Sequence, residues 1–410
     1  MKLKKFFINN YRSLVNFKIN DFDYVTVFYG LNNAGKSNIL NALEMIFRRK
    51  TKMGNTNPEN FYEGIIENSG NDFFENNTND INFEVEIDLS GDKLNTTPLI
   101  ERIIKKEKKK ILNIKGGIHR QLSNNNSADF RVSQMKYGNL IIYENDISGI
   151  TFFPSLSSTK KISGSEWRDT FSIFIEEFND CVYIISRDRD MQVEEYPTID
   201  YNSIDKDKFK SFLYNLYLNP KYHDIFEKIN NVFNSDPFKF GEISFAKTEL
   251  NKLEIMIKEN HLRLPIKHLG SGILQTLYII SSIIFYNKKI VCIEELEQNL
   301  SPYLQNKILK KLALLINDTK FGNLQQLIIS SHSSTFLAPK LALVHTITKI
   351  DGKSFIDESR KRNEVKSLKY FPKLKNHFLP SALPSDTYTV AEWDEKIRQN
   401  ISDAESLFNR

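Results

Sequence analysis

Residues 30–37 read GLNNAGKS, so a glycine, four further residues and Gly-Lys-Ser follow one another in a short stretch. Gly30 and Gly35 allow the backbone N–H groups of such a loop to turn toward one point. Lys36 would then reach the β- and γ-phosphates of a nucleotide, and Ser37 would offer its hydroxyl to Mg²⁺. The stretch predicts a phosphate cradle, whose other residues are Asn32, Asn33, Ala34 and Asn38.

Two adjacent acids, Glu294 and Glu295, follow a buried-strand pattern at residues 289–293. Neighbouring carboxylates at the end of a strand repel each other unless they share a cation. This favours Glu294 as a ligand of Mg²⁺ and Glu295 as the group that polarises an attacking water. The alternative is a solvated acidic cap before a helix that starts at Pro302, and the sequence leaves both interpretations open.

His332 comes after a third strand pattern, at residues 324–329. At the edge of a sheet a neutral imidazole can hydrogen-bond a γ-phosphate or orient a water, although a histidine after a strand more often has a structural role. Ser271 and Gly272 open an apolar helical segment whose first N–H groups would face an anion. The same Gly-Ser-Gly run is also typical of an ordinary turn before a capped helix.

The elements that would position these residues follow from the pattern of apolar side chains. Residues 24–29 are β-branched and aromatic, which indicates a buried strand, and residues 38–48 carry apolar side chains at helical spacing. Strand, glycine loop and helix thus come in the order that a phosphate-binding loop requires. We expect this loop, the acid pair and His332 to meet at one sheet edge, because three strand patterns end in them.

Length and composition set the class of protein. The 410 residues, 40% of them hydrophobic, suffice for one large domain or two ordinary ones with a proper core. Apolar runs are far shorter than the ~20 residues of a membrane span, and the start lacks a signal-peptide pattern, so we expect a cytoplasmic protein without membrane contact. Cys181 and Cys292 predict neither a disulfide nor a zinc site. A net charge of +5 permits nucleic-acid contact without requiring it.

With these pieces in order, the chain resembles the ABC-type ATPase heads of the SMC and RecF superfamily, and most closely the OLD-type ATPases of bacterial antiphage systems. The resemblance rests on GLNNAGKSN, LGSG, IEELEQNLSP and ISSHSSTFL. It implies an α/β fold, namely a P-loop ABC-type head with a mixed sheet and helices on both faces, plus a short, mainly helical insertion. It also implies ATP and Mg²⁺ as cofactors.

The resemblance further implies a homo-oligomer in which two heads sandwich two ATP molecules. Ser271 and Gly272 of one subunit would meet the γ-phosphate that Lys36 and Ser37 of the other subunit hold. His332 would sense this phosphate. Arg12, in the turn after the first strand, is a further candidate for nucleotide contact.

The predicted domains divide the chain into a head, an insertion, a helical arm and a tail. The helical pattern of the arm breaks at Pro220, and Arg360 opens a basic stretch that precedes an amphipathic helix. The boundaries are 1–95 and 240–357 for the head, which also takes 180–200, then 96–179 for the insertion, 201–239 for the arm and 358–410 for the tail.

The chain departs from the OLD pattern after its acid pair. Leu296 stands where proline is usual, and Asn299 and Ser301 replace two histidines, which leaves the rate of hydrolysis open. The stretch after His332 shows no Glu and Asp-x-Asp arrangement of a Toprim nuclease. We therefore expect a slowly hydrolysing ATPase that oligomerises on ATP and regulates a separately encoded nuclease or toxin in antiphage defence.

Two alternatives to this function stay open. One is a RecF-like repair ATPase that binds DNA itself, and DNA contact is also left open for the preferred function. The other is a scaffold that traps ATP without turnover, which the changed surroundings of the acid pair would allow.

Overall fold

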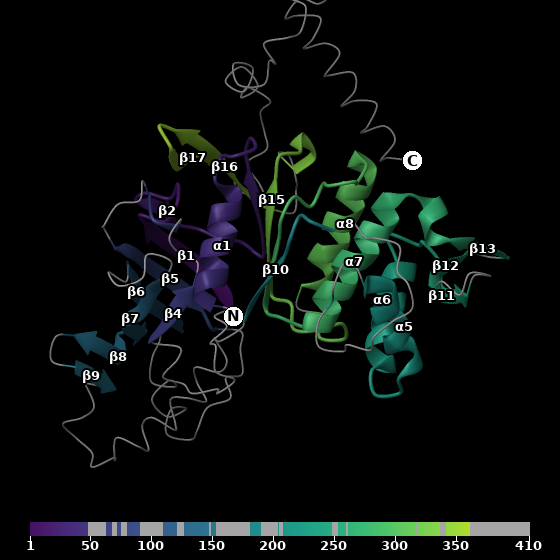
Figure 1. Cartoon of the computed structure of the whole chain (residues 1–410), viewed down its shortest axis with the longest axis horizontal. Helices are drawn as coiled ribbons and strands as arrows, with labels where there is room; N and C mark the ends of the chain where they lie inside the picture. The colour runs from purple at the N-terminus through teal and green to yellow at the C-terminus, as the bar shows by residue number, and fades with distance from the viewer. Residues whose placement is uncertain are drawn as a thin grey trace, which may run out of the picture. The chain divides into compact units, whose positions relative to one another are not determined.

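The computed structural model describes residues 1–47, 63–67, 72–74, 80–90, 110–120, 127–146, 149–152, 181–189, 204, 208–247, 253–259, 261–316, 318–336 and 342–360. These residues belong to a compact unit that spans Met1–Arg362 (Figure 1). Most of the predicted tail, residues 361–410, lies outside the described residues, as does most of the lysine-rich stretch near residue 105.

A mixed sheet, six-stranded in the described part of the chain, contains the three strands that the sequence singles out. Neighbouring strands from β10 to β16 run parallel, and β17 pairs antiparallel with β16. Residues 358–360, assigned to the tail from the sequence, complete β17. In sheet order the strands are β10 (Val182–Ile185), β14 (Ile290–Ile293), β15 (Gln326–Ser331), β3 (Val25–Tyr29), β16 (Leu343–Ile350) and β17 (Lys353–Arg360).

Alternate residues of these strands point into different hydrophobic cores, because side chains alternate across a sheet. In β3, Phe28 joins the core that contains helix α1 (Lys36–Phe47), whereas Val27 joins the core of the remaining helices. Helices thus cover both faces, as the sequence predicts. The second core is built around α5 (Phe209–Leu218), α6 (His223–Asn234), α7 (Ser271–Tyr286) and α8 (Pro302–Leu315).

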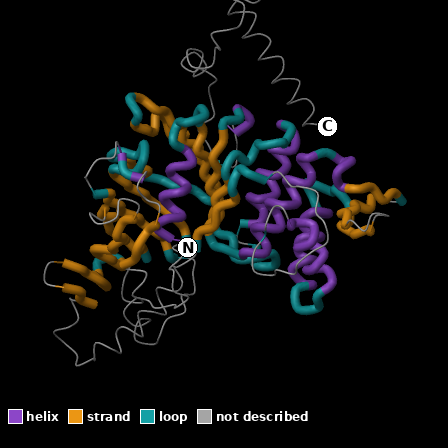
Figure 2. The backbone as a smooth tube through the Cα atoms, in the orientation of Figure 1, coloured by secondary structure: helices purple, strands orange, loops and turns teal. Residues whose placement is uncertain are grey.

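A second sheet, antiparallel over its described strands, shares a hydrophobic core with helix α1. The prediction of a mainly helical insertion at 96–179 is wrong for the described residues, since they extend this sheet (Figure 2). Leu112 and Ile114 are buried with a period of two, and β6 pairs along its length with β5. The strands are β2 (Phe17–Ile19), β1 (Lys2–Asn9), β5 (Ile81–Asp88), β6 (Ile111–Arg120), β7 (Ser127–Tyr137), β8 (Leu140–Asp146) and β9 (Gly149–Phe152), with β4 (Glu63–Glu67) beside β7.

The predicted helical segment from Asp205 to Phe233 is helical in its described part, with a break near Pro220 as predicted, because α5 ends at Leu218 and α6 begins at His223. Phe226 and Ile229 of α6 are buried in the core that α7 shares. Among the described helices, none is long and apolar enough to cross a lipid bilayer. The remaining elements are β11 (Glu242–Lys247), β12 (Leu253–Glu259), β13 (Leu262–Pro265) and the short 3₁₀ helices η4 (Ile266–Leu269) and η5 (Ser334–Phe336).

Candidate functional site

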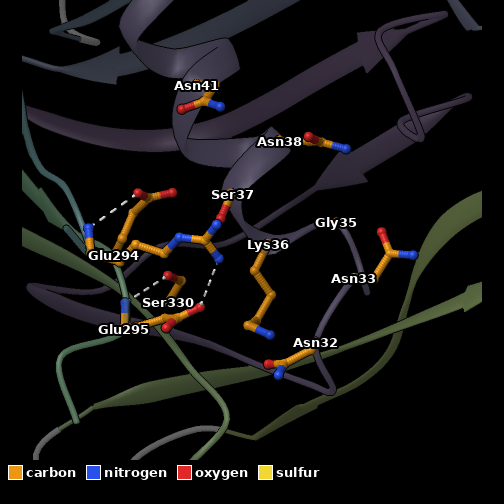
Figure 3. Close-up of a pocket in the computed structure, with 11 residues that line it drawn as sticks. Asn32, Asn33, Gly35, Lys36, Ser37, Asn38, Asn41, Glu294, Glu295 and Ser330 are labelled. Atoms are coloured by element: carbon orange, nitrogen blue, oxygen red, sulfur yellow. Dashed lines mark hydrogen bonds and ion pairs between the residues drawn. The ribbon is translucent and has the colours of Figure 1, made fainter. Parts of the chain in front are cut away.

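The glycine loop and the acid pair border one cavity of about 500 Å³ (Figure 3). The cavity lies where β3, β10, β14 and β15 end and α1 begins. The carboxyl ends of parallel strands are the usual place for a ligand in an α/β sheet. The lining residues are Asn32, Asn33, Gly35, Lys36, Ser37, Asn38, Asn41, Arg187, Glu294, Glu295 and Ser330.

The glycine loop is supported from behind by serine side chains. Ser354 Oγ, on β17, donates to the backbone oxygen of Ala34 over 2.7 Å and shares another 2.7 Å hydrogen bond with Ser13 Oγ. Gly35 has a φ of +100°, and a Cβ there would collide with Ser354 Oγ and lie 2.7 Å from Ser13 Oγ. The backbone angle and the lack of space together require glycine at this position.

Lys36, the first residue of α1, turns its ammonium group back onto the loop. Its Nζ donates to the backbone oxygens of Gly30 and Leu31, over 2.8 Å in each case. Burial lowers the pKa of Lys36 from its ordinary value, and the carboxylates of Glu297 and Glu295 act in the opposite direction. A phosphate in the cavity would stabilise this partly desolvated cation.

Glu294 and Glu295 directly follow β14, and both line the cavity. Glu295 has a φ of +44°, a left-handed angle that costs an L-residue roughly 1–2 kcal/mol and needs outside support. Ser330 gives part of it, because its Oγ accepts the N–H of Glu295 over 3.2 Å. The first turn of α8 has its own cap, since Ser301 Oγ accepts the N–H of Leu304. The interpretation of the acid pair as the cap of α8 is therefore wrong.

Arg189 joins the acid pair to α7. Its side chain is fully buried, and its guanidinium donates to the backbone oxygens of Glu294 and Glu295 over 2.8 and 2.7 Å. The guanidinium also donates to Gln275 Oε1 on α7 over 3.0 Å, and Gln275 Nε2 donates back to the Arg189 oxygen. Burial lowers the pKa of Arg189 to about 10, so it stays charged at neutral pH. The backbone of the acid pair is thus fixed relative to α7.

A comparison of the sequence with known protein families decides the class of this site. The family model described as "AAA ATPase domain" matches residues 1–337. The chain belongs to this family. It is accordingly an ATP-binding and ATP-hydrolysing enzyme with an α/β ATPase fold, as the sequence predicts.

One relative and two solved structures show how far this AAA ATPase resembles other proteins. A Helicobacter pylori protein (strain ATCC 700392 / 26695), named "ATP/GTP phosphatase", is 26% identical over 344 residues, which cover 80% of this chain and 85% of the relative. The SMC head domain from Thermotoga maritima aligns over 88% of this chain and 100% of its own, with 15% identity and a TM-score of 0.44. An Smc head domain bound to the C-terminal domain of ScpA, from Pyrococcus furiosus, aligns over 92% and 98%, with 11% identity and a TM-score of 0.45.

In this AAA ATPase, His332 is not among the residues that line the cavity, although it follows the lining residue Ser330 by two positions. Its Nδ1 is 3.0 Å from Glu297 Oε1, and its backbone N–H donates to the same oxygen over 2.6 Å. Glu297 is 7% exposed, and among the described residues its Oε2 has no hydrogen-bond partner. Sequence reasoning missed Glu297, which orients the histidine, and it also missed Arg189.

The remaining predicted residues of the ATPase lie outside the lining of the cavity. Gly30 and Ala34 form the backbone of the loop itself. Arg12 is not a lining residue, but its Nη1 donates to Asn38 Oδ1 of the lining over 3.4 Å, and its Nε donates to Asp72 Oδ1 over 2.8 Å. Ser271 and Gly272 begin α7, and they do not line this cavity either.

Replacing Arg189 with methionine is expected to lower the free energy of unfolding of the ATPase by roughly 3 kcal/mol, because Gln275 and the backbone oxygens of the acid pair would lose a buried charged donor. Urea denaturation followed by circular dichroism would measure the change. Arg187→Met is the matched control, since that side chain is 67% exposed and its loss should change stability by no more than roughly 0.5 kcal/mol. Equal losses in both variants would contradict the structural role of Arg189.

Proposed function

We propose that this ATPase works as an ABC-type homodimer, or a larger homo-oligomer, that closes on ATP and regulates a separately encoded effector. The observation that carries the proposal is the separation of two sets of residues. Lys36, Ser37 and the acid pair border one cavity, whereas Ser271 at the start of α7 is exposed and outside its lining. A second subunit would bring its own Ser271 to this cavity, and each subunit would complete the other's site.

The start of α7 has the features that such a contact needs. Gly270 precedes the helix without a side-chain cap, and a Cβ at Gly270 would meet nothing within 4 Å, so a phosphate would have space beside the N-terminus of α7. Gly272 faces inward, because a Cβ there would lie 2.9 Å from the backbone oxygen of Asn299. The helix start therefore packs directly on the loop that follows the acid pair.

The residues around the cavity suit Mg²⁺ as well as phosphate. The Ser37 hydroxyl and the Glu294 carboxylate are hard oxygen donors that border the same cavity, which is the ligand chemistry that Mg²⁺ prefers. When bound, the ion would neutralise charge on the β- and γ-phosphates. Ser37 and Glu294 would hold it, together with phosphate oxygens and water.

Glu295 would hold the water that attacks the γ-phosphate. The water oxygen bonds to the γ-phosphorus as the bond from that phosphorus to the bridging oxygen breaks, and the electron pair stays on the β-phosphate of ADP. The released proton passes to the Glu295 carboxylate and from there to the new phosphate. His332, with its Nδ1 turned to Glu297, would place Nε2 toward the γ-phosphate.

The proposal is tested by measuring the mass of the purified protein and its nucleotide turnover in the same samples. Light scattering would follow the mass without nucleotide, with ADP and with a non-hydrolysable ATP analogue, and GTP would be included because the Helicobacter relative is named for both nucleotides. We expect the mass to double, or to rise further, with the ATP analogue alone. A monomer under every condition would contradict the proposal.

The assignment to antiphage defence, the effector and the cytoplasmic location rest on the resemblance to OLD-type ATPases. Duplex DNA in the same assay separates the alternatives. Tight, salt-sensitive DNA binding that requires ATP would indicate a RecF-like repair ATPase. ATP-dependent assembly without turnover would indicate a scaffold.

A further inference from the structure

We propose that Arg187 is a mobile cation of the cavity, which neutralises Glu295 when no nucleotide is bound and turns to the γ-phosphate when ATP enters. This inference rests on the proposed function, because it takes the cavity to be the ATP site. In this proposal Arg187 binds the γ-phosphate and so favours triphosphates over diphosphates. Arg187 also controls when the Glu295 carboxylate is available to water.

Arg187 lies two residues after β10 and lines the cavity with the acid pair. Its Nη1 is 3.6 Å from Glu295 Oε1, and its backbone N–H is 3.4 Å from Glu294 Oε2. Figure 3 shows that Lys36, Ser37 and the two acids surround the same space. A guanidinium paired with Glu295 is therefore already within the site where phosphates would bind.

The neighbouring Arg189 fixes the backbone from which Arg187 projects. Its Nη1 donates to the backbone oxygen of Ser186 over 3.1 Å, and Glu294 N–H donates to the backbone oxygen of Ile185 over 2.9 Å. The side chain of Arg187 itself is 67% exposed. An exposed ion pair at this distance contributes little to stability. The backbone is thus held in place while the guanidinium can change partner at small cost.

The charges of the cavity explain why the guanidinium would move. Lys36 and Arg187 are its lining cations, and Glu294 and Glu295 are its lining acids, among the residues described. A nucleotide brings further negative charge, and Lys36 is held at the loop by two backbone oxygens. Arg187 has the freedom to follow this charge, and a guanidinium can bind two phosphate oxygens at once.

This movement would link nucleotide binding to catalysis. While Arg187 pairs with Glu295, the carboxylate oxygen that would face water is occupied by a guanidinium. When the γ-phosphate takes Arg187, that oxygen becomes available to the attacking water. ADP has no γ-phosphate, so it would leave the pair of Arg187 and Glu295 in place.

The first test compares the affinities of the wild type and of Arg187→Gln for a non-hydrolysable ATP analogue and for ADP, by isothermal titration calorimetry. We expect the variant to lose at least about tenfold in affinity for the analogue and less than about twofold for ADP. Arg187→Lys should restore part of the loss, because it keeps the charge without the forked geometry. Arg263→Gln, an exposed arginine of β13 that contacts Ser244, is the matched control and should change neither affinity.

The second test asks whether Glu295 competes with the phosphate for Arg187. We expect Glu295→Gln to bind the ATP analogue about two- to fivefold more tightly than the wild type, and the gain should vanish when Arg187→Gln is added. An analogue-to-ADP preference that Arg187→Gln leaves unchanged would overturn this inference and leave the proposed function intact. A wild type that binds neither nucleotide would overturn both.

Discussion

Replacing Lys36 with methionine is expected to remove nucleotide binding and turnover together. The ammonium of Lys36 is the buried cation of the loop, and a phosphate would take over from the backbone oxygens of Gly30 and Leu31 that hold it now. Methionine fills similar space without charge or donors, so we expect the affinity for ATP to fall by about a hundredfold or more. Calorimetric titration with ATP and a phosphate-release assay would measure both effects.

Lys311 offers a matched control for this substitution. It is another buried lysine, 6% exposed like Lys36, and its Nζ donates to Ser235 Oγ and to the backbone oxygen of Asp236 over 2.6 and 2.8 Å. Lys311→Met therefore removes an equivalent buried ammonium from α8, outside the cavity lining. If both variants lost ATP binding equally, the effect would come from damage to the fold and not from the phosphate cradle.

Replacing Glu295 with glutamine is expected to stop turnover while ATP stays bound. Glutamine keeps the size of the side chain, but it cannot accept the proton of the attacking water, so the rate should fall by about 10²- to 10⁴-fold. ATP would then be held without hydrolysis, and the ATP-bound assembly should accumulate. On the same sample, a phosphate-release assay would show the loss of turnover, and light scattering would show the accumulation of the ATP-bound assembly.

Glu86→Gln is the control for the acid substitution. Glu86 forms an ion pair with Lys5 at 2.9 Å in the antiparallel sheet, and its side chain is 23% exposed, against 22% for Glu295. We expect this variant to keep the turnover and the assembly of the wild type. Normal turnover in Glu295→Gln would show that another group activates the water.

The parts of the site that are predictable from sequence are those encoded by local patterns. Strands β3, β14 and β15 each show a short apolar run, and the glycine loop follows the first of them directly. Parallel strands then bring their ends to one sheet edge without further information. The glycine spacing also predicts that the loop needs a backbone conformation at position 35 that only glycine adopts easily. The positive φ of Gly35 agrees with this prediction.

The parts that sequence reasoning missed depend on contacts between distant residues. Arg189 acts through Gln275, 86 positions later, and Glu297 acts through His332, 35 positions later. A single arginine after a strand, or a third acid after an acid pair, has no local pattern that shows such a partner. The strands β6 to β9 escape prediction for a related reason. The lysine-rich residues before Ile111 have apolar side chains at helical spacing, whereas β6 is defined by its pairing with β5, whose residues lie 23 or more positions earlier in the chain.

The place of β3 in its sheet has a consequence for how the protein is made. Val27 of β3 pairs with Ile329 of β15 on one side and with Val344 of β16 on the other. The ribosome therefore synthesises the glycine loop long before it synthesises β15 and β16, the two strands that flank β3. At roughly 5–20 residues per second, the nascent loop waits for tens of seconds without the sheet that shapes it. The nucleotide site thus takes its final form only after β15 and β16 have been synthesised, so a nascent chain without these two strands lacks the sheet that shapes the glycine loop.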